Sequence, residues 1–403
     1  MTDTLAPEFN LRLAGEPAPT ALRGSVSALR WETAFEGADR VELTIANHDL
    51  RWLDHAALRL HTPLELTIGY APQPLERVFG GTIVSHSAAF PNGSAPTLVV
   101  AAQDARGRLQ AGTRSRGFAV DIPMVGQEPI PDIAVASHVS ADNGLVPIFE
   151  PVGAALSVLL GGVDVIGAIV DADGAQRAVR RQDAETDHEF LKRIALENGW
   201  ELLIDHHGPL GGSQLRFFSP LDHLAADVVL GWGQSLLDFS PHISTIGDLV
   251  SITVPVWVSR LKQQLVVTVR WNWDDASLDI EVRPGEAEPE VRGATGKILI
   301  SEPATAFTAP RKILAHLLPR LHERQTATAT TIGDPRIVPG AVVQVEGVGE
   351  QFGGLYRITS ATHSLDGSGY RTSFEARKEL WFGSIPRPAQ GAIPIRLTSP
   401  LTA

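Results

Sequence analysis

Residues 352–377 read FGGLYRITSATHSLDGSGYRTSFEAR, and residues 79–106 read FGGTIVSHSAAFPNGSAPTLVVAAQDAR. Both stretches begin with Phe-Gly-Gly, continue as a strand-like run, turn at an Asp-Gly or Asn-Gly pair, and return to end on Ala-Arg. Asn-Gly and Asp-Gly favour tight hairpins because these residues tolerate a positive φ. Each stretch also follows an alternating run that closes on glycine, at Gly69 and at Gly347. We therefore predict two related β-barrels in one chain.

The repeat leads to predictions for single residues. Phe79 and Phe352 are expected to hold equivalent core positions in the two barrels, and Asn92-Gly93 is expected to form the turn of the first hairpin. The alternative is that two generic hairpins match by coincidence, because such turns are common.

The totals of the chain fit a folded, turn-rich protein. The length of 403 residues predicts two or three domains. Hydrophobic residues make up 43% and charged residues 20%, and the 37 Gly and 28 Pro indicate many turns between short strands. The expected fold class is therefore mainly β, in the α+β sense, with helices confined to insertions.

Changes in the sequence pattern divide the chain into parts. Capping residues and apolar stripes predict helices in residues 113–212, above all after the capping box at Thr186 to Glu189. We expect a first barrel over residues 1–112, completed by about 213–245, around an inserted α/β domain over 113–212. The second barrel is expected to combine residues 246–301 and 333–382, with a helical insertion over 302–332. An extended tail over 383–403 follows.

Several classes of function are disfavoured. The net charge is −12 and no basic run is interleaved with aromatic residues, so stable nucleic-acid binding is not expected. There are no cysteines, which excludes thiolate nucleophiles and disulfides. Residues 152–170 are almost wholly apolar, but Asp164 and several glycines argue against a membrane span. The first residues lack the pattern of an export signal.

The sequence contains no complete catalytic, cofactor or metal motif, and we expect no such site. His188-Glu189 begins like a helical zinc motif, but Lys192 stands where the second histidine is needed. Asp205-His206-His207 is interpreted as a solvated loop rather than as a pair of metal ligands, because adjacent strand side chains point to opposite faces. The chain is therefore not expected to be an enzyme.

Motifs along nearly the whole chain resemble one known family. The central ones are Arg181-Gln182 with Asp187 and Glu189-Phe190-Leu191, followed by Leu230-Gly231-Trp232-Gly233. The residues that carry the resemblance in the barrels, together with Trp232, are Phe79, Gly80, Gly81, Asn92, Gly93, Asp104, Gly340, Phe352, Gly354, Tyr356, His363, Gly369, Tyr370 and Phe374. This pattern resembles the phage late-control protein D family, which forms the tail hub of contractile phages and is related to the hub part of type VI secretion spike proteins.

The resemblance implies a structural role in a phage tail or a phage-tail-like injection particle. The family's role implies a homotrimer of two tail-tube-like β-barrels per chain, which presents six similar units and joins a sixfold inner tube to a threefold spike. The implied partners are the inner tube protein, the spike protein and baseplate-wedge proteins, with assembly in the cytoplasm and possible release of the particle. A tail-tip protein that binds the host surface or carries an effector is the alternative, and a cell-wall hydrolase is the third.

The last residues of the chain suggest a contact with the spike. Residues 383–403 hold four prolines and cannot continue as a helix. Ile393, Ile395 and Leu397 alternate with Pro394 and Arg396, as in a strand with one apolar face. A strand needs a partner edge, and we expect this edge to lie on the spike. A disordered terminus is the alternative.

Overall fold

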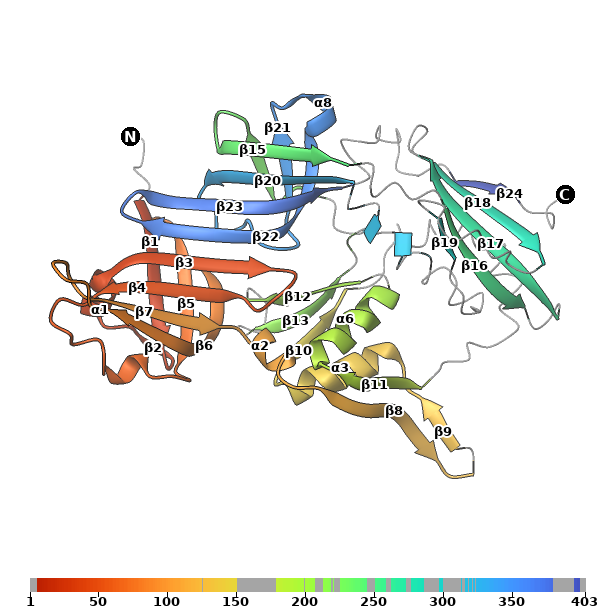
Figure 1. The fold of residues 1–403 in the computed structure, drawn as a ribbon, viewed down its shortest axis with the longest axis horizontal. Coiled ribbons are helices and arrows are strands. Elements are labelled where there is room, and N and C mark those ends of the chain that lie inside the picture. The colour runs from red at the N-terminus through yellow and green to blue at the C-terminus, as the bar shows by residue number, and fades with distance from the viewer. Residues whose placement is uncertain are drawn as a thin grey trace.

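The computed structural model describes residues 6–124, 126–150, 179–206 except 199, 213–220 except 219, 225–244, 251–258, 262–272, 277–285, 297–299, 313–379 except 314, 315, 318, 321 and 323, and 395–398. Strands dominate these residues. They form one sheet of thirteen strands, one of five and two of three, with a few short helices (Figure 1). The predicted mainly β fold class is confirmed.

The first part of the large sheet comes from the N-terminal residues. Its strands alternate buried and exposed positions, as β4 does by burying Val41, Leu43 and Ile45 in a core of leucine, valine and tryptophan side chains. The elements are β1 (Ala6–Leu13), β2 (Glu16–Pro17), α1 (Thr20–Ser25), β3 (Val26–Ala34), β4 (Arg40–Ala46), the 3-10 helix η1 (Ala56–Leu58), β5 (Pro63–Ala71), β6 (Glu76–Ala89), β7 (Thr97–Gln103) and α2 (Arg106–Leu109).

The inserted α/β region follows and has its own core around Phe190 and Phe217. It contains β8 (Arg114–Ile122), β9 (Gly126–Pro129), α3 (Asp132–Asp142), β10 (Val146–Phe149), β11 (Arg180–Glu185), α6 (Asp187–Glu197), β12 (Glu201–Asp205) and β13 (Gln214–Phe218). These strands form two sheets in the orders β11-β8-β9 and β10-β13-β12. Residues 214–218 therefore belong to this region, beyond its expected end at 212.

The second part of the large sheet uses strands from both sides of residue 300. They are β14 (Val228–Gly231), β15 (Leu236–Ile243), β20 (Gln325–Ile332), β21 (Val342–Glu346), β22 (Gly354–Asp366) and β23 (Gly369–Lys378), with the short helix α8 (Gly349–Phe352). The expectation that residues 213–245 complete the first barrel is wrong, because β14 pairs with β21 and β15 pairs with β20.

Residues 246–301 do not join residues 333–382, which corrects the predicted second barrel. They form a separate sheet in the order β19-β16-β17-β18-β24, from β16 (Ser251–Val258), β17 (Gln263–Asn272), β18 (Ser277–Pro284), β19 (Lys297–Leu299) and β24 (Ile395–Thr398). On its paired side β15 has β20 as its neighbour, a strand that follows residues 246–301 in the chain. The sequence assigned residues 246–301 to the second barrel, but alternation along a strand does not show which sheet the strand joins.

The expected helical insertion over 302–332 is only partly correct. Described residues between 313 and 322 are helical, with Ile313 and Leu317 buried. Residues 325–332 instead form β20, whose QTATATTI sequence alternates buried and exposed positions with the period of a strand.

The two parts of the large sheet have the same internal order. We call β1, β3, β4, β5, β6 and β7 the first unit, and β14, β15, β20, β21, β22 and β23 the second unit. Counted along the chain, the strands of each unit lie in the order 2-3-6-5-4-1. One difference is that β1 pairs with β5 antiparallel, whereas β14 pairs with β21 parallel. The duplication predicted from the two hairpins is thus visible in the topology.

Within the described residues, no helix is both long and apolar enough to cross a membrane. The apolar segment 152–170 lies outside them.

Candidate functional site: edges of a duplicated sheet

The two units share their pairing registers as well as their strand order. The fifth strand carries a β-bulge at Val84 in the first unit and at Thr359 in the second. The second strand carries a bulge at Ser27 in the first unit and at Leu237 in the second. Because a bulge fixes the register of its neighbours, these four residues align the two units residue by residue.

This alignment corrects the expected equivalence of Phe79 and Phe352. Phe79 is fully buried and pairs with Leu66. In the second unit the residue equivalent to Leu66 is Val345, and Val345 pairs with Gly354. The structural counterpart of Phe79 is therefore Gly354. Phe352 ends α8 and is only half-buried. A one-turn helix precedes the strand in the second unit, so the shared Phe-Gly-Gly letters do not occupy the same structural position.

The two units are joined edge to edge inside the chain. The outer half of β22, from Ser360 to Asp366, pairs antiparallel with β3, from Ala34 to Ala28. The fifth strand of the second unit thus pairs with the second strand of the first unit (Figure 1). We call this pairing the internal junction.

His363 lies at the centre of the internal junction, opposite Trp31. Its ring stacks on the Trp31 ring with centroids 4.3 Å apart. Its Nε2 lies 3.0 Å from the Ile337 carbonyl, and its Nδ1 lies 2.9 Å from the Tyr370 hydroxyl and 3.0 Å from that of Thr372. The neutral ring therefore donates at Nε2 and accepts at Nδ1. Complete burial lowers the pKa of His363 to about 4.

The strand edges that correspond to the two sides of the internal junction lie on β6 and β15, and within the described residues they have no neighbouring strand. β6 pairs with β5 only as far as Thr82, and among the described residues Ser85 to Ala89 pair with β7 alone. Likewise, among the described residues, Asp238 to Ile243 of β15 pair with β20 alone, at the end of the sheet. Within the described part of the chain, β6 therefore has a free fifth-strand edge and β15 has a free second-strand edge, which we call the two open edges.

A buried polar cluster ties the inserted region to the first unit. His206 Nε2 lies 3.2 Å from an oxygen of Asp39 and 3.9 Å from one of Asp104, and all three residues are buried. The expectation of a solvated loop at His206 is wrong, because its partners are distant in sequence. Burial, with the neighbouring Asp39 charge, raises the pKa of Asp104 to about 7.

The same three side chains offer ligand atoms that lie within 4.8 Å of one another, an arrangement that could hold a divalent cation. Asp39 and His206 also line a cavity of about 370 Å³ between the inserted region and the two units. Arg106 already provides compensating charge beside Asp104. We therefore interpret the cluster as a structural contact that holds the inserted region against the first unit.

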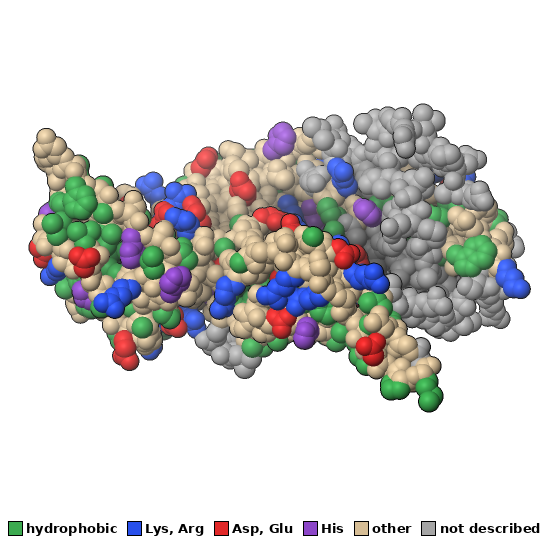
Figure 2. Space-filling model, turned by 60° about the horizontal axis from the view of Figure 1, so that its bottom comes forward, with side chains coloured by type: hydrophobic (Ala, Val, Ile, Leu, Met, Phe, Trp, Pro, Cys, Tyr) green, Lys and Arg blue, Asp and Glu red, His purple; other side chains and the backbone are tan. Residues whose placement is uncertain are grey.

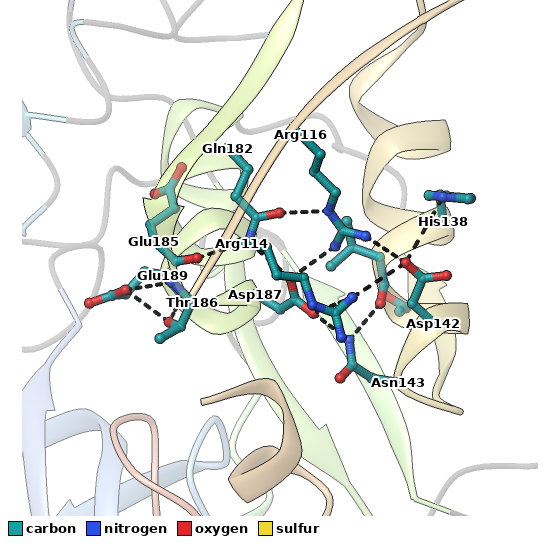
Figure 3. Close-up of polar contacts among 12 residues, drawn as sticks. Arg114, Arg116, His138, Asp142, Asn143, Gln182, Glu185, Thr186, Asp187 and Glu189 are labelled. Carbon is teal, nitrogen blue, oxygen red and sulfur yellow. Dashed lines mark hydrogen bonds and ion pairs between the residues drawn. The ribbon is translucent and has the colours of Figure 1, made fainter. Parts of the chain in front are cut away.

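The family-like motif of the inserted region is a polar network centred on Asp187 (Figure 3). Asp187 accepts hydrogen bonds from Arg116, Asn143 and Gln182 at 2.9 Å. Burial alone would raise the pKa of Asp187, but the hydrogen bonds from Asn143 and Gln182 and the arginine charges lower it overall. The predicted capping box is present, because Thr186 accepts from the Glu189 N–H and the Glu189 carboxylate accepts from the Thr186 N–H. The network fixes α6 against β8 and α3.

The projecting β8–β9 hairpin ends in apolar side chains, which are green at the lower right of Figure 2. Val120, Ile122 and Met124 are among the exposed large hydrophobic residues there.

The structure places the other predicted motif residues in the two units. Gly81 is required because a Cβ would lie 2.2 Å from the Gln103 carbonyl oxygen, and Gly369 turns the second hairpin at φ +116°. Trp232 is exposed, while Tyr356, Tyr370 and Phe374 are buried. Gly80 lies in β6, Asn92 and Gly93 turn the first hairpin, and Gly340 precedes β21.

The expected spike contact at the tail stays a prediction, but the structure gives its strand a partner within the chain. Ile393 lies outside the described residues. Ile395 and Leu397 lie in β24, which pairs parallel with Leu278–Glu281 of β18 in the same chain. The partner edge of this strand is thus internal.

Known structures share this fold. No sequence-family description and no curated protein matches the chain. Among solved structures, the 43 kDa tail protein of prophage MuSo2 from Shewanella oneidensis matches with a TM-score of 0.60 and 16% identity, over 94% of this chain and all of that one. The tail protein from Neisseria meningitidis MC58 matches with a TM-score of 0.60 and 14% identity, over 94% of this chain and 98% of that one.

The chain has the fold of a phage tail protein. The E. coli c3393 protein, described as a component of the type VI secretion system, matches with a TM-score of 0.53 and 12% identity, over 94% of this chain and 81% of that one. Its description notes similarity to the T4 tail proteins gp27 and gp5. The predicted likeness to phage-tail and type VI secretion proteins is therefore confirmed at the level of the fold.

Proposed function

We propose that the chain is the structural hub of a contractile tail or injection-system baseplate. In this role three copies form a ring that joins a sixfold inner tube to a threefold spike. The observation that carries the proposal is the duplication, because each chain supplies two units with matching strand order, registers and bulges. Three such chains present six similar units, the number that a sixfold tube meets.

A mechanical rather than catalytic role fits this geometry. The buried polar cluster around Asp104 joins two parts of the fold. The three fold neighbours given above are described as tail or secretion-system proteins. The proposed partners are the inner tube protein, the spike protein and the baseplate-wedge proteins, within a phage tail or a phage-tail-like particle.

The proposal is tested by the mass and the partners of the purified full-length chain. Light scattering at micromolar concentration, with and without candidate tube and spike proteins from the same source, should give a species of three chains that retains both partners. A monomer under both conditions would overturn the hub. Release of fragments from purified peptidoglycan would favour the wall-hydrolase alternative, and binding to host cells without tube or spike would favour the tail-tip alternative.

A further inference from the structure

The internal junction shows which edges of the two units fit each other. It joins a fifth strand, β22, to a second strand, β3. The two open edges are the same two kinds of edge: β6 is a fifth strand and β15 is a second strand. Since the bulges align the units, the edge that β22 presents to β3 has its counterpart in β6, and the edge that β3 presents has its counterpart in β15.

Burial differs between the equivalent halves of the fifth strands. In the first unit every residue from Val84 to Phe90 is exposed, on both faces of the strand, and Phe90 is 62% exposed. In the second unit the equivalent residues 359–365 are buried or half-buried. Pairing with β3 in the internal junction accounts for part of the burial of residues 359–365. A strand half with apolar residues exposed on both faces and one free edge is typical of a surface that another sheet completes.

The partner edge has matching features. β15 exposes Leu237 at 49%, together with Asp238, Ser240 and His242. Phe239 is half-buried and packs against the core of the second unit. In the internal junction, the residue equivalent to Phe239 is Leu29, which pairs with Leu365.

We propose that β15 of one copy of this chain pairs antiparallel with the outer half of β6 in the next copy, repeating the internal junction between molecules. The inference rests on the proposed hub and names the strands that would build its ring. Transferring the register of the internal junction places Ser240 opposite Ala89 and Phe239 opposite Phe90. At the other end it places Ile243 opposite His86.

This pairing is head to tail, because the two strands that meet are different. Each copy uses one β6 edge and one β15 edge, so a closed ring leaves neither open. Backbone hydrogen bonds provide the affinity of such strand addition, and the side chains that alternate along the strands provide its specificity. Pro241 removes one donor from β15, so this strand contributes fewer N–H groups than β3.

The absence of cysteine makes a direct test possible, because every disulfide that forms must join introduced cysteines. Residues directly opposite in an antiparallel pair have Cα atoms about 4.5–5.5 Å apart, within the range that a disulfide spans. We would prepare Ala89→Cys and Ser240→Cys as separate full-length variants and mix them under mild oxidation. The expected product on a non-reducing gel is a dimer that needs both variants.

The double variant Ala89→Cys/Ser240→Cys should in turn form a covalent ladder that ends at the closed ring. The matched control is Ala89→Cys/Ile243→Cys, whose second cysteine lies three residues out of register and on the other face of the strand. It should cross-link at least tenfold less than the in-register pair. Equal cross-linking of both pairs, or of neither while the protein is a trimer, would overturn the pairing and leave the hub intact.

A second measurement does not depend on a disulfide. Phe90→Asp should weaken self-association at least about tenfold, since it removes a large, exposed apolar side chain from the proposed contact with Phe239. Val120→Asp is the control, because Val120 is similarly exposed, at 52%, and lies in the sheet β11-β8-β9, which contains neither open edge. Both variants should give wild-type circular dichroism as folded chains. An unchanged association of Phe90→Asp would contradict the pairing, whereas a wild-type chain that is monomeric even with its partners would remove the proposed hub itself.

Discussion

Acid should weaken the internal junction through His363. The neutral ring is fully enclosed and hydrogen-bonded, and burial lowers its pKa from 6.5 to about 4. In the unfolded chain the ring takes up a proton as the pH falls through about 6.5, but the folded chain resists protonation until about 4. The stabilising contribution of the buried neutral ring is therefore complete above pH 6.5 and is lost progressively between pH 6.5 and pH 4.

The size of this effect follows from the difference between the two pKa values. Each pKa unit corresponds to about 1.4 kcal/mol, so the free energy of unfolding should fall by about 3 kcal/mol across this window because of His363 alone. In His363→Gln the amide can still donate to the Ile337 carbonyl and accept from a hydroxyl, but it does not titrate. The variant should therefore lack this part of the pH dependence.

The assay is urea unfolding followed by circular dichroism at several pH values between 4 and 8. The quantity of interest is the change in unfolding free energy between pH 7 and pH 4, compared among wild type, His363→Gln and His48→Gln. His48 is exposed, so its variant should follow wild type. If His363→Gln shows the same pH dependence as wild type, the argument that burial keeps the ring neutral is refuted.

Three further predictions concern packing and pairing. Phe79→Ala should cost about 3–5 kcal/mol of stability, whereas Phe352→Ala should cost clearly less, because only Phe79 is fully buried; equal losses in urea unfolding would contradict this. Arg357→Met should cost about 3–5 kcal/mol by leaving Glu379 buried without its cation, and adding Glu379→Leu should recover much of that loss; failure of the double variant to recover would contradict it. Deleting residues 383–403 should lower hydrogen-exchange protection in β18 without changing oligomerisation, and unchanged protection would contradict the β24 pairing.

Local signals in the sequence predicted much of the fold. Asn92-Gly93 and the Asp-Gly pair of the second hairpin mark turns whose conformation depends on the residues themselves. The capping box at Thr186 is equally local, and the structure contains it as predicted. The duplication followed from two such hairpins, and the shared strand order extends it to six strands in each unit.

The remaining features depend on contacts between segments far apart in sequence. Residues 251–258 were expected in the second barrel, but alternation along this strand does not show which sheet it joins. His206 resembled a solvated histidine because Asp39 and Asp104, its partners, stand more than a hundred residues before it. No sequence motif marks Trp31 as part of the internal junction. No motif marks β15 as a strand with a free edge either.

The central claim is that this chain is a ring-forming hub built from a duplicated unit. Native mass spectrometry of the full-length chain, purified together with its tube and spike proteins, tests it most directly. The account predicts a dominant complex with three copies of the chain, hence six units, bound to the spike. A complex with a single copy of the chain, or with a number of copies that does not give six units, would contradict it.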